Sequence, residues 1–363
     1  MAKWLKSSAF INFDVRDRVA WITMNRPEKR NALSPELIRE LHDAMLEADD
    51  LNSVSVIVLS GAGEDFCSGY DLSYGSDPKN QTDPEGIYRS RIGSFDDDVW
   101  TMTRKMHQML IIQDIHKPVI AKVHGRALAG GSELMLLCDM IIAADDAKIG
   151  HPGTRGLGSP PLNMWFYHVG PQWAKRLLLT GDSITGRDAA RIGLVLDSVP
   201  AEQLDAEVEA LAKHVAQNDP DMLSANKRII NMAMEMAGAR NLQKLSTDMD
   251  ARAHLSKQPL RTNFKADAAK YGVKVAYQNR DAKFGDVGNA HENSPSLSRP
   301  APPASYMANF LTVWSGIVTV RAAESSAAGR LRAHSTDAGA SRRRGGSAPE
   351  RTPSAGSRRA GRR

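Results

Sequence analysis

Residues 116–153 read HKPVIAKVHGRALAGGSELMLLCDMIIAADDAKIGHPG, and this stretch decides the fold of the 363-residue chain. It opens with the apolar run Val119 to Val123, which is typical of a strand buried on both faces. A glycine-rich turn follows, then helical spacing over Ser132 to Cys138 and a second strand pattern from Met140 to Ala144. The stretch therefore predicts a strand, a turn, a helix and a strand in that order.

The glycine-rich turn, Gly125 to Gly131, has two interpretations. Glycines before a helix let a ligand approach bare backbone N–H donors, and the helix N-terminus adds partial positive charge, so the turn suits a developing oxyanion. Glu133 in the first helical turn is then a candidate general base. Alternatively, the glycines only allow tight packing of the helix on the strand.

Composition limits the class of protein. The two cysteines, Cys67 and Cys138, form neither a disulfide framework nor a zinc pattern, which suits a reducing cytoplasm. We expect both to be small apolar residues of the core. Residues 1–13 have no apolar core of a signal peptide, and no apolar run reaches the roughly 20 residues of a membrane span. We therefore expect a cytoplasmic protein with no membrane segment and no transition metal.

The net charge of +5 is concentrated in the C-terminal tail. Residues 321–363 contain 11 arginines and three acidic residues, a local charge of +8, which leaves −3 for the rest of the chain. The folded body is therefore not predicted to bind nucleic acid. The tail is either a polybasic arm for nucleic acid or acidic lipid, or a solvated extension, because its composition cannot form a core.

Alternating strand and helix patterns precede a helical C-terminal region. A β-hairpin is expected over 11–24, a helix capped by Ser34, and a buried strand over 54–59. Further helices are expected over 98–114, 162–180, 202–218, 221–237, 241–257 and 264–278, and a mobile loop over 73–97. We predict an α/β core over 1–200, a helical region over 201–287 that covers the site and forms the oligomer, and a disordered tail over 288–363.

Several ordered motifs resemble the crotonase (enoyl-CoA hydratase/isomerase) family across residues 9–280. They are NRPEKRNALS at 25–34, DFCSGYDL at 65–72, KPVIAKVHGRALAGGSEL at 117–134, CDMIIAADDAKIGHPG at 138–153 and LTGDSITGRDAARIGLVLDSVP at 179–200. The resemblance implies an α/β spiral of ββα units with a C-terminal helical region, assembled as homo-trimers or hexamers. It also implies an acyl-CoA thioester substrate and no permanently bound cofactor.

The resemblance implies roles for individual residues. The backbone N–H groups of Tyr70 and Gly130 would form an oxyanion hole that stabilises the thioester enolate, and Glu133 would be the acid/base. One such donor is worth about 2.7–4 kcal/mol. Because only the amide of Tyr70 is required, its side chain either reshapes the acyl entrance or is an ordinary half-buried aromatic.

The same resemblance implies a coenzyme A site. Arg26, Lys29 and Arg30 would lie beside the phosphates, although each could also be an ordinary surface charge. Ala32 would lie near the pantetheine arm, and Asp71 and Leu72 near the adenine. The expected substrate-binding set is completed by Ser68, Gly69, Gly131 and Gly153.

Gly153 departs from the family pattern. Family hydratases use a second glutamate where this chain has Gly153, and residues 147–181 contain no Asp or Glu. Either a water or His151 replaces that acid, or His151 is structural and the protein binds acyl-CoA without hydrating it. Another enolate reaction, isomerisation or C–C hydrolysis, would use the same site.

Overall fold

A computed structural model describes residues 2–6, 8–72 and 94–284. The predicted tail and residues 73–93 of the predicted loop lie outside this range, whereas residues 95–97 belong to a helix. The central sheet has the strand order β1-β2-β3-β4-β6-β9. Within this sheet, β1 and β2 pair antiparallel and the other neighbouring strands pair parallel. The strands are β1 (Ile11–Arg16), β2 (Val19–Met24), β3 (Val56–Gly61), β4 (Val119–Val123), β6 (Met140–Ala144) and β9 (Asp197–Val199).

A second sheet of three short strands was not expected from the sequence. It consists of β5 (Arg126–Leu128), β7 (Lys148–Gly150) and β8 (Ser183–Thr185). The chain passes from β4 to β5 and then into α3, and from β6 to β7 before α4, so each of these two turns contributes a strand to both sheets. The predicted α/β core is therefore present, with its strands divided between two sheets.

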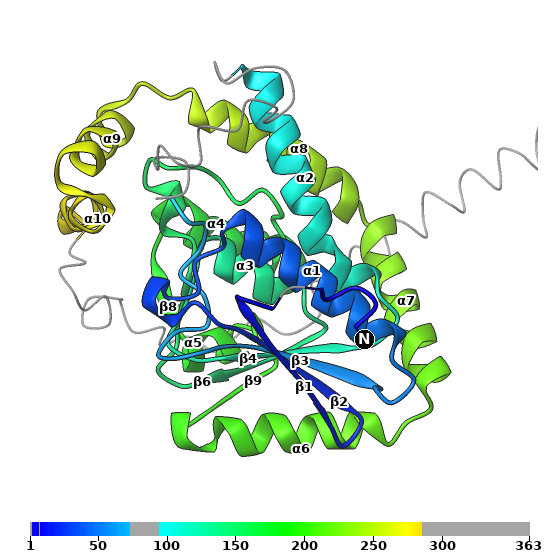
Figure 1. Cartoon of the computed structure of the whole chain (residues 1–363). Coiled ribbons are helices and arrows are strands. Elements are labelled where there is room, and N and C mark those ends of the chain that lie inside the picture. The colour runs from blue at the N-terminus through cyan, green and yellow to red at the C-terminus, as the bar shows by residue number, and fades with distance from the viewer. Residues whose placement is uncertain (1, 7, 73–93, 285–363) are drawn as a thin grey trace, which may run out of the picture. The chain divides into compact units, whose positions relative to one another are not determined.

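Helices cover both faces of the large sheet (Figure 1). The helices α1 (Pro35–Asp50), α2 (Phe95–Asp114) and α3 (Gly130–Leu136) lie on one face, and α6 (Leu204–Ala216) packs on the other. Ser34 caps α1 as predicted, because its hydroxyl accepts the N–H of Leu37 at 3.3 Å. The helix α4 (Trp165–Thr180) bends at Gly170 before Pro171.

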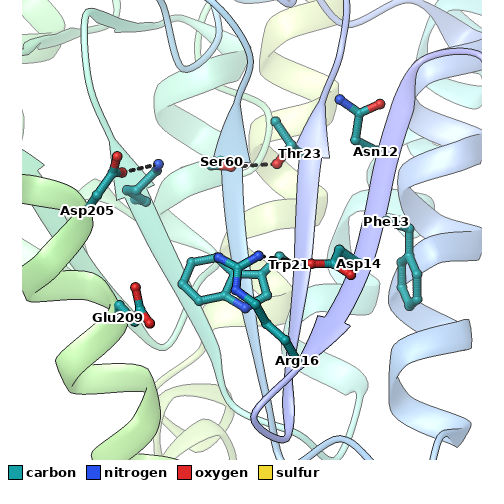
Figure 2. A pocket seen from close by; sticks show the side chains of 10 residues that line it. Asn12, Phe13, Asp14, Arg16, Trp21, Thr23, Ser60, Asp205 and Glu209 are labelled. Atoms are coloured by element: carbon teal, nitrogen blue, oxygen red, sulfur yellow. Dashed lines mark hydrogen bonds and ion pairs between the residues drawn. The ribbon is translucent and has the colours of Figure 1, made fainter.

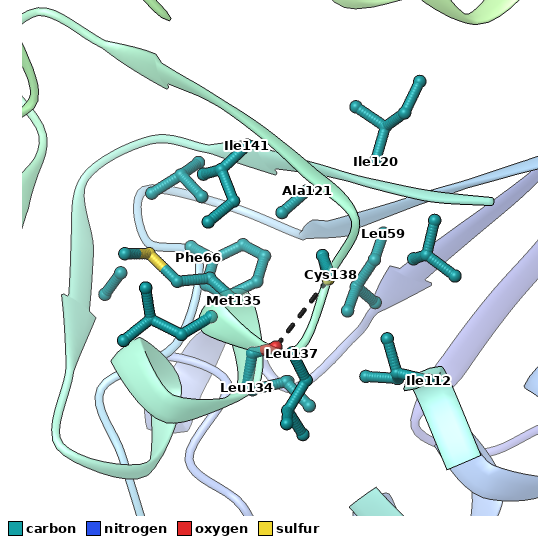
Figure 3. Packing of buried hydrophobic residues seen from close by; sticks show 14 of the residues in the cluster. Leu59, Phe66, Ile112, Ile120, Ala121, Leu134, Met135, Leu137, Cys138 and Ile141 are labelled. Atoms are coloured by element: carbon teal, nitrogen blue, oxygen red, sulfur yellow. Dashed lines mark hydrogen bonds between the residues drawn. The ribbon is translucent and has the colours of Figure 1, made fainter. Parts of the chain in front are cut away.

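The short helix α3 rests on a fully apolar part of the core (Figure 3). Leu134 and Met135 are inaccessible to solvent and pack with Phe66 and side chains from β3, β4 and β6. Cys138 is also buried, as predicted, and its thiol lies 3.7 Å from the Leu134 carbonyl. This packing fixes α3, and hence Glu133, against the sheet.

The C-terminal helices differ in what they cover. The four after α6 are α7 (Pro220–Met236), α8 (Ala239–His254), α9 (Pro259–Tyr271) and α10 (Val273–Ala282). The single helix predicted over 264–278 is wrong: the chain breaks at Gly272, whose φ of 85° ends α9. Whereas α6 lies on the sheet, α8 lies alongside α2. No helix in the described part of the chain has the length and apolar character needed to span a membrane.

A buried lysine attaches α7 to the core. The Lys227 ammonium lies 3.0 Å from the Asp139 carboxylate and donates to the carbonyls of Ile112 and Lys117 at 2.7 and 3.0 Å. Its side chain is 2% exposed. Its charge is therefore compensated by groups from three different segments.

Replacing Lys227 with Met should lower the free energy of unfolding by about 3–5 kcal/mol, because the largely buried Asp139 carboxylate would lose its counter-charge. Urea denaturation at neutral pH measures this loss. The matched change of the exposed neighbour Arg228 to Met should have little effect. Equal stability of the two variants would contradict the assigned role of Lys227.

Candidate active site

Close backbone contact brings α3 beside the segment that carries Tyr70. A Cβ atom on Gly131 would lie 2.2 Å from the Cys67 carbonyl oxygen, so only glycine fits there. Gly69, with φ of 107°, similarly approaches the start of α3: a Cβ there would be 3.4 Å from the Gly130 nitrogen. The predicted residues 69–70 and 130–131, far apart in sequence, are thus adjacent in space.

The direction of the Tyr70 amide follows from a short parallel bridge. Leu33 donates its N–H to the Gly69 carbonyl at 2.8 Å, and Asp71 donates to the Leu33 carbonyl at 3.1 Å. Since peptide groups alternate along an extended strand, the N–H of Tyr70 points away from Leu33. The Gly130 N–H belongs to the first turn of α3, where amides have no partner within their helix.

Glu133 is almost fully buried, at 1% exposure. One carboxyl oxygen, Oε1, accepts the N–H of Leu162 at 2.7 Å and that of Asn163 at 3.5 Å. Burial raises the pKa of Glu133 to about 8, despite the opposing hydrogen bond from Leu162. Near neutral pH, the group is therefore mostly a carboxylic acid that can donate a proton.

The side chain of Tyr70 lies across the start of α3. A Cβ on Gly130 would be 2.8–3.0 Å from three carbon atoms of the Tyr70 ring. The Tyr70 hydroxyl lies 3.3 Å from Oε2 of Glu133, and 3.9 Å from the sulfur atoms of Met106 and Met109. The ring therefore forms one wall beside Glu133.

The predicted coenzyme A residues fall into two groups. Arg26 turns inward: its guanidinium donates to the Ala32 carbonyl at 2.6 Å and to the Asp71 carboxylate at 3.1 Å. This side chain is 12% exposed, and it links the segment around Ala32 to the segment that carries Tyr70. Leu72, by contrast, is exposed.

Lys29 and Arg30 form the exposed group. Both side chains are open to solvent, and Arg30 lies 3.7 Å from the buried carboxylate of Asp65. Ser68 is attached to the same turn, since its N–H donates to the Arg30 carbonyl at 3.0 Å. Two cations therefore lie next to the segment that carries Tyr70.

Gly153 lies in a single turn of 3₁₀ helix, Pro152–Thr154, beside His151. A Cβ added to Gly153 would meet the His151 Nε2 at 3.0 Å, and its backbone does not have a positive φ. His151 is 3% exposed, and burial lowers its pKa to about 4. A neutral imidazole at pH 7 favours the structural interpretation of His151.

Three features of the site were missed in the sequence. The buried amide of Asn31 donates to the carbonyls of Ala62 and Asp65 at 2.9 and 2.7 Å, which fixes the turn that carries Arg30. The N–H groups that hold Glu133 come from Leu162 and Asn163, inside a predicted helix that begins only at Trp165. Asp250, on α8, is the third feature; no local pattern connects it to Glu133.

A separate cleft of about 370 Å³ opens beside α6 (Figure 2). Its wall includes Trp21, with the Arg16 guanidinium 4.2 Å from the ring, and Asp205 of α6. The cleft contains none of the predicted site residues. This cleft is therefore distinct from the predicted site.

Comparison with known proteins decides the family. The sequence model of the enoyl-CoA hydratase/isomerase family matches residues 14–260. The chain belongs to this family. It is 36% identical to an enoyl-CoA hydratase of Mycobacterium smegmatis, whose crystal structure matches with a TM-score of 0.71 over 78% of this chain and 97% of that one.

Two further family members are similar along most of their length. A crotonyl-CoA hydratase of Syntrophomonas wolfei is 29% identical over 76% of this chain and 97% of its own. A hydroxycinnamoyl-CoA hydratase-lyase of Pseudomonas fluorescens is 31% identical over 66% of this chain and 84% of its own. The crotonase resemblance drawn from the sequence motifs is thus confirmed.

The raised pKa of Glu133 should make its effect on stability depend on pH. Between its ordinary value near 4.5 and about 8, the folded state holds a proton that the unfolded state releases, so folded stability falls as pH rises. Glu133→Gln removes this loss, which amounts to about 1.4 kcal/mol per pH unit. Its melting temperature should therefore exceed that of the unmodified protein by a larger margin at pH 8 than at pH 5.

The exposed residue Glu207 supplies the control. Glu207→Gln should change the melting temperature by the same small amount at both pH values. A constant difference between Glu133→Gln and the unmodified protein would mean that burial does not shift the Glu133 proton equilibrium.

Proposed function

We propose that this protein is an acyl-CoA-processing enzyme of the enoyl-CoA hydratase type. The observation that carries the proposal is the buried carboxyl of Glu133 beside the glycine contact between residues 69–70 and 130–131. A thioester carbonyl that accepts the N–H groups of Tyr70 and Gly130 would have its negative charge stabilised as the enolate forms. The hydratases among its relatives support the same reaction class.

In this mechanism, Glu133 supplies a proton to the substrate. Its raised pKa keeps the carboxyl protonated at neutral pH, so it can deliver a proton to Cα while the oxygen of a water adds to Cβ. The N–H of Leu162 holds Oε1, so we assign proton transfer to Oε2, which faces the Tyr70 hydroxyl at 3.3 Å. The Tyr70 ring, stacked on Gly130, would limit the width of the acyl entrance.

Coenzyme A recognition is assigned to the turn over residues 26–32. The exposed Lys29 and Arg30 suit the phosphates, because cations that remain solvated can attract them without a large desolvation cost. Arg26, already paired with Asp71, would position this turn. Ala32, Ser68 and Leu72 complete the coenzyme-binding segment, and no permanently bound cofactor is proposed.

One observation favours a second function, acyl-CoA binding without hydration. Gly153 stands where family hydratases have their second glutamate, and the neutral His151 beside it is a poor replacement acid. Isomerisation or C–C cleavage of an acyl-CoA enolate would also use Glu133. Turnover of enoyl-CoA substrates distinguishes these functions.

The unmodified protein should hydrate crotonyl-CoA or a longer enoyl-CoA, and Glu133→Gln should lower kcat by at least about 10²-fold because the proton donor is lost. Affinity for the saturated ligand butyryl-CoA, measured by titration, should be largely kept. Glu207→Gln is the control and should retain full activity. Binding without turnover by the unmodified protein would select the second function, and full activity of Glu133→Gln would exclude Glu133 as the acid.

We also propose that the chain assembles as a homo-trimer or a hexamer. The helix α7 exposes Met222, Ile229, Ile230, Met232 and Met236, and α8 exposes Leu245 and Met249. Apolar surface of this extent is typical of an interface between subunits. We propose further copies of the chain as the partners that cover this surface.

A chain ending at Asp286 should keep the trimeric or hexameric mass and bind butyryl-CoA normally, because the family motifs and the exposed helices all precede this residue. Light scattering and ligand titration provide the two measurements. A monomeric shortened chain would contradict the proposed assembly, and lost binding would show that the boundary of the folded part is misplaced.

A further inference from the structure

The helix α8 has its polar and apolar residues on unexpected faces. Its buried residues include Gln243, Ser246, Thr247 and Asp250, whereas Leu245 and Met249 are exposed. A helix that packs only to fill a core buries its apolar face. Filling an apolar core therefore does not explain the four polar residues on the buried face of α8.

Asp250 is the only carboxylate on this buried face, and it is 5% exposed. Its Oδ1 accepts the N–H of Ser159 at 2.7 Å, and a Cβ on Gly158 would lie 2.3 Å from the same oxygen. The described residues give its other oxygen, Oδ2, no hydrogen-bond donor. Asp250 is thus a buried carboxylate with one oxygen fixed and one available.

Asp250 and Glu133 are attached to the same short segment. Ser159 binds Asp250, and Leu162 binds Glu133; these amides are three positions apart in the chain, so they lie within about 11 Å of each other. Asn163 adds a second link, because its N–H faces Glu133 at 3.5 Å while its side-chain amide donates to Ser246 at 3.2 Å. The negative charge of Asp250 also contributes to the raised pKa of Glu133 and of Tyr70.

Charged groups from several elements face Asp250. His254, one turn later on α8, has its Nε2 at 3.6 Å from Oδ1, and its Nδ1 lies 2.7 Å from Asp98 of α2. The other charged or titratable groups around Asp250 are Arg261 of α9, Glu133 of α3 and Tyr70. Burial raises the pKa of Asp250, while a charged His254 and the Ser159 hydrogen bond lower it.

Resting on the hydratase function proposed above, we propose that Asp250 is the second catalytic carboxylate, supplied from α8 as the general base for the attacking water, because position 153 carries no carboxyl. Gly153 lies on the same loop as Gly158 and Ser159, which Asp250 contacts. The second carboxylate is therefore supplied by α8 and not by the loop that carries Gly153. Two carboxyls with different surroundings can divide the acid and base roles.

The proton balance is complete with these two groups. Ionised Asp250 accepts one proton of a water whose oxygen forms the new C–O bond at Cβ, and Glu133 gives its proton to Cα as the Cα=Cβ double bond is lost. The product is the 3-hydroxyacyl-CoA, with both atoms of hydrogen accounted for. Transfer of the proton from Asp250 back to Glu133, through solvent, restores the starting state.

The test compares two isosteric amide variants on the same helix, Asp250→Asn and Asp248→Asn. Asparagine can still accept the Ser159 N–H, so folding and butyryl-CoA affinity should be kept. The kcat/KM for crotonyl-CoA should fall at least about 10²-fold in Asp250→Asn only, and its decrease toward acid pH should disappear because the titrating base is gone. The decrease above pH 8, due to Glu133, should remain.

A second variant distinguishes catalysis from structural support. His254→Gln removes a positive charge that favours the ionised form of Asp250, so the acidic limb of the pH profile should move to higher pH while the basic limb stays in place. A purely structural Asp250 would leave both limbs unchanged.

The possible failures can be told apart. Active wild-type protein with an Asp250→Asn variant of equal kcat/KM and unchanged pH profile would overturn the role of Asp250 alone. An acidic limb that His254→Gln does not move would also overturn it. Wild-type protein that binds butyryl-CoA but hydrates no enoyl-CoA would overturn the proposed hydratase function and this role together.

Discussion

The site depends on the contact between the start of α3 and the segment around Cys67. Side chains are excluded there, since a Cβ on Gly131 would lie 2.2 Å from the Cys67 carbonyl. This approach places residues 69–70 beside residues 130–131, and Glu133, in the first turn of α3, is 1% exposed. The apolar packing of Leu134 and Met135 below α3 resists any movement that would open the contact.

Burial of Glu133 follows from the same contact and determines its chemistry. A carboxylate is poorly solvated in this position, so the proton is retained to about pH 8. The hydrogen bond from Leu162 holds the group in place without supplying a full counter-charge. An acid that is protonated at neutral pH, and fixed by the backbone, is suited to proton transfer to a substrate carbon.

Arg26 shows how packing can assign a different task to a predicted residue. The sequence presents it as one of three cations in NRPEKR, without distinguishing it from Lys29 and Arg30. In the fold, its guanidinium turns inward to Asp71 and Ala32, while the other two side chains face solvent. Charge can be read from composition, but the direction of a side chain depends on neighbours that are distant in the chain.

The sequence alone determined the family, through its ordered motifs, and most strands of the large sheet, through local hydrophobic periodicity, which is a property of adjacent residues. It did not predict β5, β7 and β8, which have three residues each and are too short for a periodic signal. Only the tertiary structure decided that Asp250 approaches the segment holding Glu133. Asp250 and Glu133 are 117 residues apart, so no local sequence pattern links them. The position of Asp250 depends on how α8 packs beside α2.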